Sequence, residues 1–432
     1  MPHNPPRFST FDAWLRWQEQ LHPNPIDLGL ERVNRVLRVM NLEQPPYKVL
    51  TVGGTNGKGS CASFLDAMLR AQGYRVGAYT SPHLLRYNER VCVNGVEASD
   101  AEFCEAFERV DQARGEVSLT YFEFGTLAAF EIFRRHKINV AVLEVGMGGR
   151  LDAVNAADPL GALVASVGLD HQEWLGPDRD SIGCEKAGIY RHGRPAICGD
   201  REPPARLLET AGQLGADLKV LGRDFDWRES NGGWTWQSGE TRIENLPPPA
   251  LPGRIQYDNA ASVIALLRAV RAELEVGEAA IRKGLQQARI AARFERVPGK
   301  VELIFDIAHN PDAARVLAAN LATTRGRGRT LAVVGMFRDK AAEDVARALS
   351  DSVNDWFLGG LSGPRGQSAE ELAARLRSVL PQAQLSEHAT VVDAWQAAQA
   401  AAQPGDRIVV FGSFQTAAAV LRIRQESVTN RT

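Results

Sequence analysis

Short apolar runs alternate with longer stretches of helical periodicity over much of this chain. Between residues 48 and 200, the runs with the length and β-branched content of strands are 48–52, 75–79, 140–145 and 162–167. Helical patterns cover the intervening segments 60–72, 100–114 and 122–136. Strands that alternate with helices build βαβ units. The pattern therefore predicts an α/β fold with a mostly parallel central sheet.

The same alternation starts again near residue 300. Strands are predicted at 301–306, 330–335, 355–358 and 407–412, and helices at 311–322, 340–349, 368–379 and 392–402. A joint near Arg296 then divides the chain into a larger domain over residues 1–296 and a smaller α/β domain over residues 297–432. In the larger domain, further helices are predicted at 9–21, 29–42 and 258–274, and a small antiparallel excursion at 224–245.

Composition narrows the function classes. The 432 residues suit roughly two or three domains, and a formal net charge of −2 provides no broad basic field for nucleic acid. No apolar run approaches the length of a membrane span, and no apolar signal segment is visible near the start. The five cysteines lack metal-binding spacing, which favours reduced thiols. We expect a cytoplasmic protein that binds neither nucleic acid nor membrane, and we favour a monomer.

A glycine-rich segment, Gly-Gly-Thr-Asn-Gly-Lys-Gly-Ser, runs from Gly53 to Ser60, between a predicted strand and a predicted helix. Its glycines let backbone N–H groups turn toward a phosphate, and Lys58 can reach the terminal phosphates of a nucleotide. It departs from the usual P-loop because Val52 occupies the first glycine position and Gly59 separates Lys58 from the hydroxyl. The segment predicts a polyphosphate site. A glycine-rich turn with an exposed lysine is the alternative.

Other predicted strands end in side chains that suit a metal. Glu144 lies at the end of one apolar run, and Asp170-His171 follows the next. Because the carboxyl ends of parallel strands line one crevice, Glu144 could hold Mg²⁺ beside the phosphates and His171 could bind a divalent metal. Ser81 follows the strand predicted at 75–79 and offers a hydroxyl near the same crevice. A solvated glutamate and an ordinary hydrogen-bonded histidine are the alternatives.

Weaker patterns single out three more residues. Lys186 lies in a short helical stretch whose other residues are largely uncharged, and a surface lysine is its ordinary interpretation. Arg293 and Asp306 flank the domain joint, and Asp306 ends a predicted strand. Asp306 could bind a ribose, but a role in a turn or a helix cap is equally consistent with the pattern.

Together these motifs resemble the muramyl-ligase superfamily, and within it the folylpolyglutamate synthase/dihydrofolate synthase family. The motifs that carry the resemblance occur in family order at 54–60, 80–84, 143–152, 170–171, 185–188, 306–311 and 412–414. The resemblance implies a P-loop NTPase-like central domain and a smaller C-terminal Rossmann-like domain that closes over ATP. One departure is that Ala291-Ala292 precedes Arg293-Phe294, where the family often has Pro-Gly.

The resemblance also implies site residues. Nucleotide contacts are implied for Thr55, Asn56, Gly57, Lys58, Asn259, Arg293 and Asp306. Two Mg²⁺ sites are implied, the first at Ser81 and Glu144 and the second at His171. Lys186 matches the lysine that the family carbamylates, a change that converts a cation into an anionic oxygen ligand for Mg²⁺. The implied catalytic residues are Lys58, Lys186 and His171.

A pterin pocket is implied as well. Its residues are Asp27, Leu28, Gly29, Leu30, Tyr121, Phe122, Glu123, Phe124, Leu151, Asp152 and Ala153. Phe122 and Phe124 could stack on a flat heterocycle, and Asp27 could accept hydrogen bonds from ring N–H groups.

The implied reaction is the ATP-dependent addition of L-glutamate to dihydropteroate and to reduced folates such as tetrahydrofolate, through an acyl phosphate. A muramyl-peptide ligase, the nearest alternative, would need a uridine-nucleotide pocket that the segment before the P-loop does not predict. A non-catalytic nucleotide switch would need Lys58 but has no use for Glu144, His171 and Lys186 together.

Overall fold

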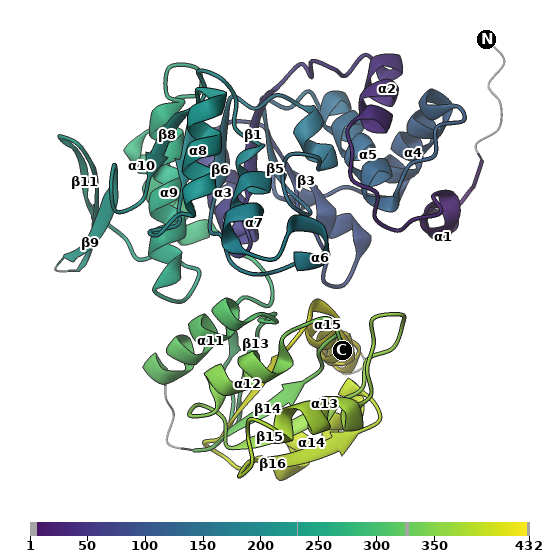
Figure 1. The fold of residues 1–432 in the computed structure, drawn as a ribbon, viewed down its shortest axis with the longest axis vertical. Helices are drawn as coiled ribbons and strands as arrows, with labels where there is room; N and C mark the ends of the chain where they lie inside the picture. The colour runs from purple at the N-terminus through teal and green to yellow at the C-terminus, as the bar shows by residue number, and fades with distance from the viewer. Residues whose placement is uncertain (1–6, 231, 325–327, 430–432) are drawn as a thin grey trace. The chain divides into compact units, whose positions relative to one another are not determined.

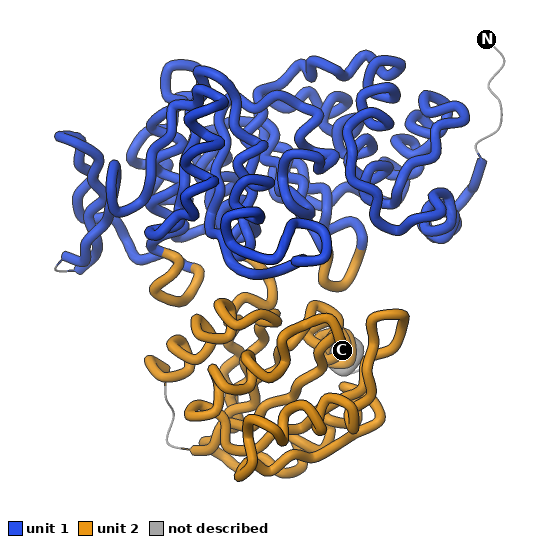
Figure 2. Tube along the Cα trace, viewed as in Figure 1, with its two compact units in different colours: residues 1–82, 87–250, 257–289 blue, residues 83–86, 251–256, 290–432 orange. Residues whose placement is uncertain are grey.

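The computed structural model describes residues 7–230, 232–324 and 328–429. The chain forms two units, shown in Figure 2. Unit 1 comprises Met1–Pro82, Tyr87–Ala250 and Tyr257–Arg289, and unit 2 comprises His83–Arg86, Leu251–Gln256 and Ile290–Thr432. Two short segments from the first two thirds of the chain thus belong to unit 2, which no local sequence pattern indicated. The domain division between residues 296 and 297 stays a prediction.

Unit 1 is built on an eight-stranded sheet with the order β4-β3-β2-β5-β1-β6-β7-β8. Its parallel strands are β1 Lys48–Gly53, β2 Val76–Tyr79, β5 Val140–Glu144, β6 Gly161–Val164, β7 Pro195–Cys198 and β8 Asp217–Val220. Two short strands, β3 Val91–Val93 and β4 Val96–Glu97, extend one edge in the antiparallel direction. Strands β1 and β5 are near-continuous apolar runs because almost every residue in them is buried.

Helices surround this sheet (Figure 1). They are α1 Phe11–Leu21, α2 Glu31–Met40, α3 Lys58–Gln72, α4 Asp100–Arg114, α5 Tyr121–Arg135, α6 Gln172–Leu175, α7 Arg179–Ala187, α8 Ala205–Leu214, α9 Ile255–Ala269 and α10 Glu278–Gln287, with the 3₁₀ turns η1 Tyr87–Arg90 and η2 Ala153–Ala156. Capping boxes start three of them, at Ser99 for α4, Thr120 for α5 and Asp178 for α7. Each box satisfies backbone N–H groups that the helix itself cannot, so these helices begin at residues set by local sequence.

A separate three-stranded antiparallel sheet follows β8 in the chain. It consists of β9 Asp226–Ser230, β10 Gly233–Ser238 and β11 Thr241–Leu246, in the order β11-β10-β9. Trp234 and Trp236 of this sheet are fully buried. The antiparallel excursion predicted at 224–245 is confirmed.

Unit 2 contains a six-stranded sheet with the order β12-β13-β17-β14-β15-β16. The parallel strands are β13 Glu302–Phe305, β14 Thr330–Val334, β15 Asp355–Gly359, β16 Gln384–His388 and β17 Arg407–Phe411, and β12 Glu295–Val297 is antiparallel at the edge. Its helices are α11 Pro311–Thr323, α12 Ala342–Leu349, α13 Ala369–Arg377, α14 Val391–Ala401 and α15 Phe414–Thr429. Two α/β units with largely parallel sheets confirm the predicted fold class.

Sequence patterning missed β3, β4, β7 and β8 of the first sheet and β12 and β16 of the second, which include the outermost strands of both and the apolar strand β7. β8 contains Asp217 and Lys219, and β16 contains Glu387 and His388, so neither is an apolar run. Edge strands face solvent on one side and tolerate such residues. The strand predicted at 162–167 was too long, because β6 ends at Val164. Among the described residues, no helix has the length and apolar character that a membrane crossing requires.

Helices α3 and α10 approach so closely at Gly284 that a side chain has no room there. A Cβ atom on Gly284 would lie 2.4 Å from Cγ and 2.6 Å from Cα of Met68. We expect Gly284→Ala to lower the free energy of unfolding by about 1–3 kcal/mol, because the helices must move apart. Urea denaturation measures this change.

The matched control is Gly212→Ala in α8, where a new Cβ would meet no atom within 4 Å. Alanine there should raise the free energy of unfolding by up to about 1 kcal/mol, because glycine weakens a helix interior. Equal effects of the two substitutions would contradict the close packing at Gly284.

Candidate active site

The residues predicted to bind phosphate and metal lie at the carboxyl ends of four neighbouring strands of unit 1. In sheet order, β2 leads to Ser81, β5 ends in Glu144, β1 leads into the glycine-rich loop, and β6 leads to Asp170 and His171. The carboxyl ends of parallel strands form the ligand crevice of an α/β sheet. The sheet order therefore brings together residues that lie far apart in the chain.

Backbone geometry shapes the glycine-rich loop, residues 53–60. Gly54 has a φ of 138° and Gly57 a φ of 85°, both in the region that favours glycine. Gly57 precedes α3 and provides no capping side chain, and the N-terminus of a helix favours a negatively charged ligand. Nζ of Lys58 donates to the carbonyl oxygens of Gly54 at 2.9 Å and Thr55 at 3.2 Å, so its charge lies over the loop.

The segment after β6 holds this loop in place. The N–H of Thr55 donates to the carbonyl oxygen of Ser166 at 2.7 Å, and the N–H of Asn56 donates to Oγ of Ser166 at 3.1 Å. The N–H of Gly168 donates to Oγ1 of Thr55 at 3.0 Å. Ser166 and Gly168 were not assigned a role from the sequence. The one sequence feature that could have indicated their role is their position between an apolar run and Asp170-His171.

Asn259 of α9 lies against the loop from another side. A Cβ atom on Gly57 would be 2.7 Å from Oδ1 of Asn259, and Sγ of Cys61 is 3.7 Å from the same oxygen. The Asn259 side chain is buried. This placement beside the loop agrees with a nucleotide contact, which stays a prediction.

The metal candidates offer mainly oxygen donors. Glu144 is buried, and its Oε2 accepts a hydrogen bond from the N–H of Ser81 at 3.3 Å. The N–H of His171 donates to Oδ1 of Asp170 at 2.9 Å, and the His171 ring stays about a third exposed, at 38%. Within the described segments, no three His, Cys, Asp or Glu side chains converge on a metal position. This set suits Mg²⁺, which binds through one or two carboxylates plus water and substrate phosphates.

Lys186 is not the surface lysine that its local sequence suggests. It lies in the last turn of α7 and is only 4% exposed. Burial, and then the charge of Lys58, lowers the pKa of Lys186 to about 7, while Asp170 and Asp152 act in the opposite direction. A large fraction of this amine is therefore neutral near pH 7. Its electrostatic neighbours are all residues of the candidate site.

Asp152 lies in a buried corner next to Phe122. Its Oδ2 accepts from the N–H of Met147 at 2.9 Å, and its Oδ1 accepts from the N–H of Val154 at 3.1 Å. A Cβ atom on Gly146 would lie 2.7 Å from the Phe122 ring and 3.2 Å from Oδ2 of Asp152. Both residues therefore border Gly146, as a shared pterin pocket requires. Burial raises the pKa of Asp152 to about 6.

Asp152 makes the stability of the protein depend on pH. Its folded-state pKa of about 6 lies above the ordinary value of 3.8, so its stabilising contribution is present below about pH 4 and is lost as the pH rises through 6. We expect the wild type to lose about 2 kcal/mol relative to Asp152→Asn between pH 4 and pH 8. Urea unfolding of both proteins at several pH values measures this, and a difference that does not change with pH would contradict it.

An arginine that sequence reasoning missed joins two parts of the predicted pterin pocket. NH1 of Arg32 donates to Oδ2 of Asp27 at 2.9 Å, and Nε of Arg32 donates to Oε1 of Glu123 at 3.1 Å. Arg32 and Glu123 are 91 residues apart, so no local pattern could reveal the pair. The structure thus brings the segment around Asp27 next to the start of α5.

The other pocket candidates differ in exposure. Leu28, Gly29, Leu30, Tyr121, Phe122 and Leu151 are half-buried, and Ala153 is buried. Phe124 is fully buried, with its ring centroid 5.6 Å from that of Phe107 and 5.9 Å from that of Trp17. Phe124 therefore belongs to the aromatic core, and its stacking on a heterocycle stays a prediction.

Arg293 and Asp306 are neighbours in unit 2. Burial raises the pKa of Asp306, and the positive charge of Arg293 opposes this rise. The Asp306 carboxylate accepts hydrogen bonds from the N–H of Phe294 at 2.9 Å and from the N–H of Ala308 at 2.8 Å. Ala292 and Phe294, on either side of Arg293, have φ values of 53° and 49°. Ala292 thus adopts a conformation that suits glycine, at a cost of about 1–2 kcal/mol. Strain of this kind clusters at functional sites.

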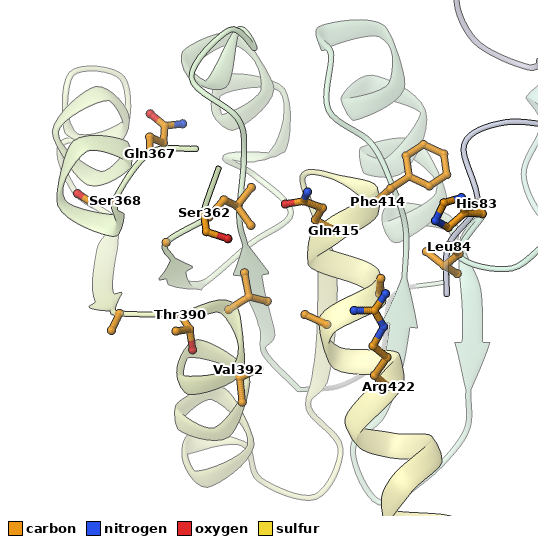
Figure 3. A pocket seen from close by; sticks show the side chains of 16 residues that line it. His83, Leu84, Ser362, Gln367, Ser368, Thr390, Val392, Phe414, Gln415 and Arg422 are labelled. Atoms are coloured by element: carbon orange, nitrogen blue, oxygen red, sulfur yellow. The ribbon is translucent and has the colours of Figure 1, made fainter. Parts of the chain in front are cut away.

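Unit 2 also contains a cavity of about 760 Å³ beyond the ends of β15 and β16. Figure 3 shows Gln415 and Arg422 reaching toward it from α15, with Ser362 and Thr390 at its other side. Hydroxyl, amide and guanidinium groups suit a small polar or anionic molecule. His83, which also lines it, comes from one of the sequence motifs, but the cavity was not predicted.

Comparisons with known proteins agree with the geometry. Residues 292–414 match the family described as "Mur ligase, glutamate ligase domain". The dihydrofolate synthase/folylpolyglutamate synthase of Escherichia coli K12 is 43% identical over 419 residues, which cover 97% of this chain and 96% of the relative. The corresponding Haemophilus influenzae protein is 38% identical, with 95% and 96% covered.

Solved structures show the same similarity over the whole chain. Escherichia coli FolC in complex with DHPP and ADP is 42% identical, has a TM-score of 0.93, and is matched over 99% of this chain and 100% of that one. A bifunctional folylpolyglutamate synthase/dihydrofolate synthase with Mn, AMPPNP and L-glutamate bound is 43% identical, with a TM-score of 0.90 and 98% and 100% covered. The chain therefore belongs to the dihydrofolate synthase/folylpolyglutamate synthase family of the Mur ligases.

Proposed function

We propose that this protein is an ATP-dependent carboxylate–amine ligase with two activities. It adds L-glutamate to dihydropteroate, which gives dihydrofolate, and to tetrahydrofolates, which extends a polyglutamate tail. The observation that carries the proposal is the convergence of the glycine-rich loop, Glu144 and buried Lys186 at one end of one sheet. Family members with ADP, AMPPNP, DHPP or L-glutamate bound support these substrates.

The chain's own residues hold the phosphates. The N-terminus of α3 and the ammonium group of Lys58 bind the triphosphate and neutralise part of its charge. A carboxylate oxygen of the substrate attacks the γ-phosphorus and forms an oxygen–phosphorus bond. The bond between the γ-phosphorus and the bridging oxygen breaks, and ADP leaves. The amine of L-glutamate then attacks the acyl carbon, phosphate leaves, and the amine loses a proton. Positioning and charge neutralisation are the main demands of phosphoryl transfer.

Ser81 and Glu144 would hold one Mg²⁺ ion and His171 a second, and the bound ions would supply further positive charge beside the phosphates. We propose that Lys186 is carbamylated. Its neutral amine attacks CO₂, a nitrogen–carbon bond forms, and one proton leaves, which converts a buried base into an anionic oxygen donor. Burial that favours the neutral amine supports this reaction.

The pterin would bind between the Asp27–Leu30 segment, the start of α5 and the turn at Asp152. Arg32 holds the first two segments together, and Phe122 offers a ring beside Asp152. We also propose Thr55, Asn56, Gly57, Asn259, Arg293 and Asp306 as nucleotide-binding residues. One chain supplies all of these residues, so we propose that a monomer is active.

Mass spectrometry of reaction products tests both activities. The protein is incubated with ATP, Mg²⁺ and L-glutamate, and with either dihydropteroate or tetrahydrofolate. We expect a mass gain of one glutamate residue with each, accompanied by ADP. No product with dihydropteroate would leave only the tail-extending activity. Phosphate release that does not depend on pterin and glutamate would instead favour a nucleotide switch.

A further inference from the structure

The small antiparallel sheet of unit 1 binds the start of α9 through its tryptophans. In that sheet, Trp227 of β9 pairs directly with Trp236 of β10. Nε1 of Trp236 donates to the carbonyl oxygen of Ala261 at 3.0 Å.

Trp227 makes two different contacts with the first turns of α9. Its indole ring stacks on Tyr257, with ring centroids 4.7 Å apart and an interplanar angle of 22°. Its Nε1 donates to Oδ1 of Asp258 at 2.8 Å. Arg201 donates to the same oxygen from Nε at 3.1 Å and NH2 at 2.8 Å. The indole of Trp227 and the guanidinium of Arg201 thus both hold the Asp258 carboxylate. Hydrogen bonds to a charged group are stronger than those between neutral groups.

The next residue is Asn259, whose Oδ1 lies against the glycine-rich loop. The distance from that oxygen to a Cβ position on Gly57 is only 2.7 Å, so a small rotation of α9 would move the amide relative to the loop. Consecutive helical residues point about 100° apart, so Asp258 and Asn259 face different neighbours. Contacts at Tyr257, Asp258 and Ala261 therefore hold the first turns of α9, next to Asn259.

We infer that Trp227 and Asp258 are positioning residues for nucleotide binding, and that the β9–β11 sheet sets the amide of Asn259 against the glycine-rich loop. This inference rests on the proposed nucleotide contact of Asn259. Neither residue needs to touch the nucleotide. Their effect passes through the rotation of α9.

Trp227→Phe tests the inference, because it keeps a stacking ring and removes the N–H that Asp258 accepts. The matched control is Trp234→Phe. Trp234 lies in the same sheet, is fully buried, and donates from Nε1 to the carbonyl oxygen of Pro247. Its ring also lies edge-on to Tyr257 of α9, with centroids 5.6 Å apart, and phenylalanine keeps a ring there while removing an N–H that α9 does not accept. We expect Trp227→Phe to weaken ADP binding, measured by calorimetry, about fivefold and to raise KM for ATP similarly. KM for L-glutamate and the ADP affinity of Trp234→Phe should stay at wild-type values.

Hydrogen exchange at the backbone amides of residues 259–263 gives a readout that needs no nucleotide. We expect faster exchange in Trp227→Phe than in Trp234→Phe. If Trp227→Phe does not fold, Asp258→Ala removes the acceptor of the same hydrogen bond from the helix side. Equal exchange and equal ADP affinity in the Trp227 and Trp234 variants would overturn the inference.

A double-mutant cycle with Asn259→Ala separates this inference from the proposed function. If Trp227 acts through Asn259, Trp227→Phe should cause no further loss of ADP affinity when Asn259 is already alanine. Additive losses would overturn the inference while leaving the ligase proposal intact. Absence of ADP binding by the wild type would contradict the proposed function, and hydrogen exchange would still decide the inference.

Discussion

Lys58→Ala is expected to lower kcat for glutamate addition about a hundred- to a thousandfold. Nζ of Lys58 lies over the carbonyl oxygens of Gly54 and Thr55, within the loop that the start of α3 completes. Charge on the phosphate oxygens must be neutralised as the γ-phosphoryl group moves, and the variant lacks the one side-chain cation of this loop. Steady-state assays of ADP formation and of glutamylated product measure the loss.

Lys137→Ala is the control for Lys58→Ala. Lys137 is exposed and follows α5, at the end of the sheet where β5 begins, away from the glycine-rich loop. Its removal should leave kcat unchanged. Both variants should unfold at the wild-type urea concentration, because Lys58 is only half-buried and its hydrogen bonds go to loop carbonyls. A loss of kcat smaller than tenfold corresponds to less than about 1.4 kcal/mol of transition-state stabilisation. If Lys58→Ala kept more than a tenth of wild-type kcat, a role in neutralising the phosphates would therefore be ruled out.

Lys186→Ala is expected to lower kcat at least about a hundredfold, because the proposed carbamate oxygen is lost. Acetate or another short carboxylate should restore part of the activity by entering the space that the side chain vacates. Steady-state rates with increasing acetate measure the rescue. Lys186→Met is the matched control, since methionine fills much of that buried space and leaves no room for acetate.

Each possible result for the Lys186 variants leads to a different conclusion about the carbamate. Full activity of Lys186→Ala would remove the carbamate from the mechanism. Lys186→Ala and Lys186→Met could instead lose the same share of kcat, with no recovery in acetate. That result would assign Lys186 a role in packing or as a free amine. Mass spectrometry of the native protein under CO₂ should also show the added carbamate mass on the wild type and on neither variant.

The local sequence predicted those features of the structure whose physical cause lies within a few neighbouring residues. The glycine-rich loop was recognisable because φ values such as those of Gly54 and Gly57 favour glycine and because strand, loop and helix follow one another. The buried strands β1 and β5 were recognisable because burial on both faces demands continuous apolar residues. Strands such as β8 and β16, with charged residues at a sheet edge, gave no such pattern.

The sequence by itself determined the α/β class, the phosphate-binding loop, and the family to which its motifs point. Only the tertiary structure decided which side chains are buried and which distant ones meet. Lys186 follows an ordinary helical pattern, yet burial beside Lys58 lowers its pKa to about 7. Arg32 and Glu123, and likewise Trp227 and Asp258, form contacts across long stretches of chain. The physical reason is that desolvation and Coulomb interactions depend on distance in space, which sheet order sets and local sequence does not.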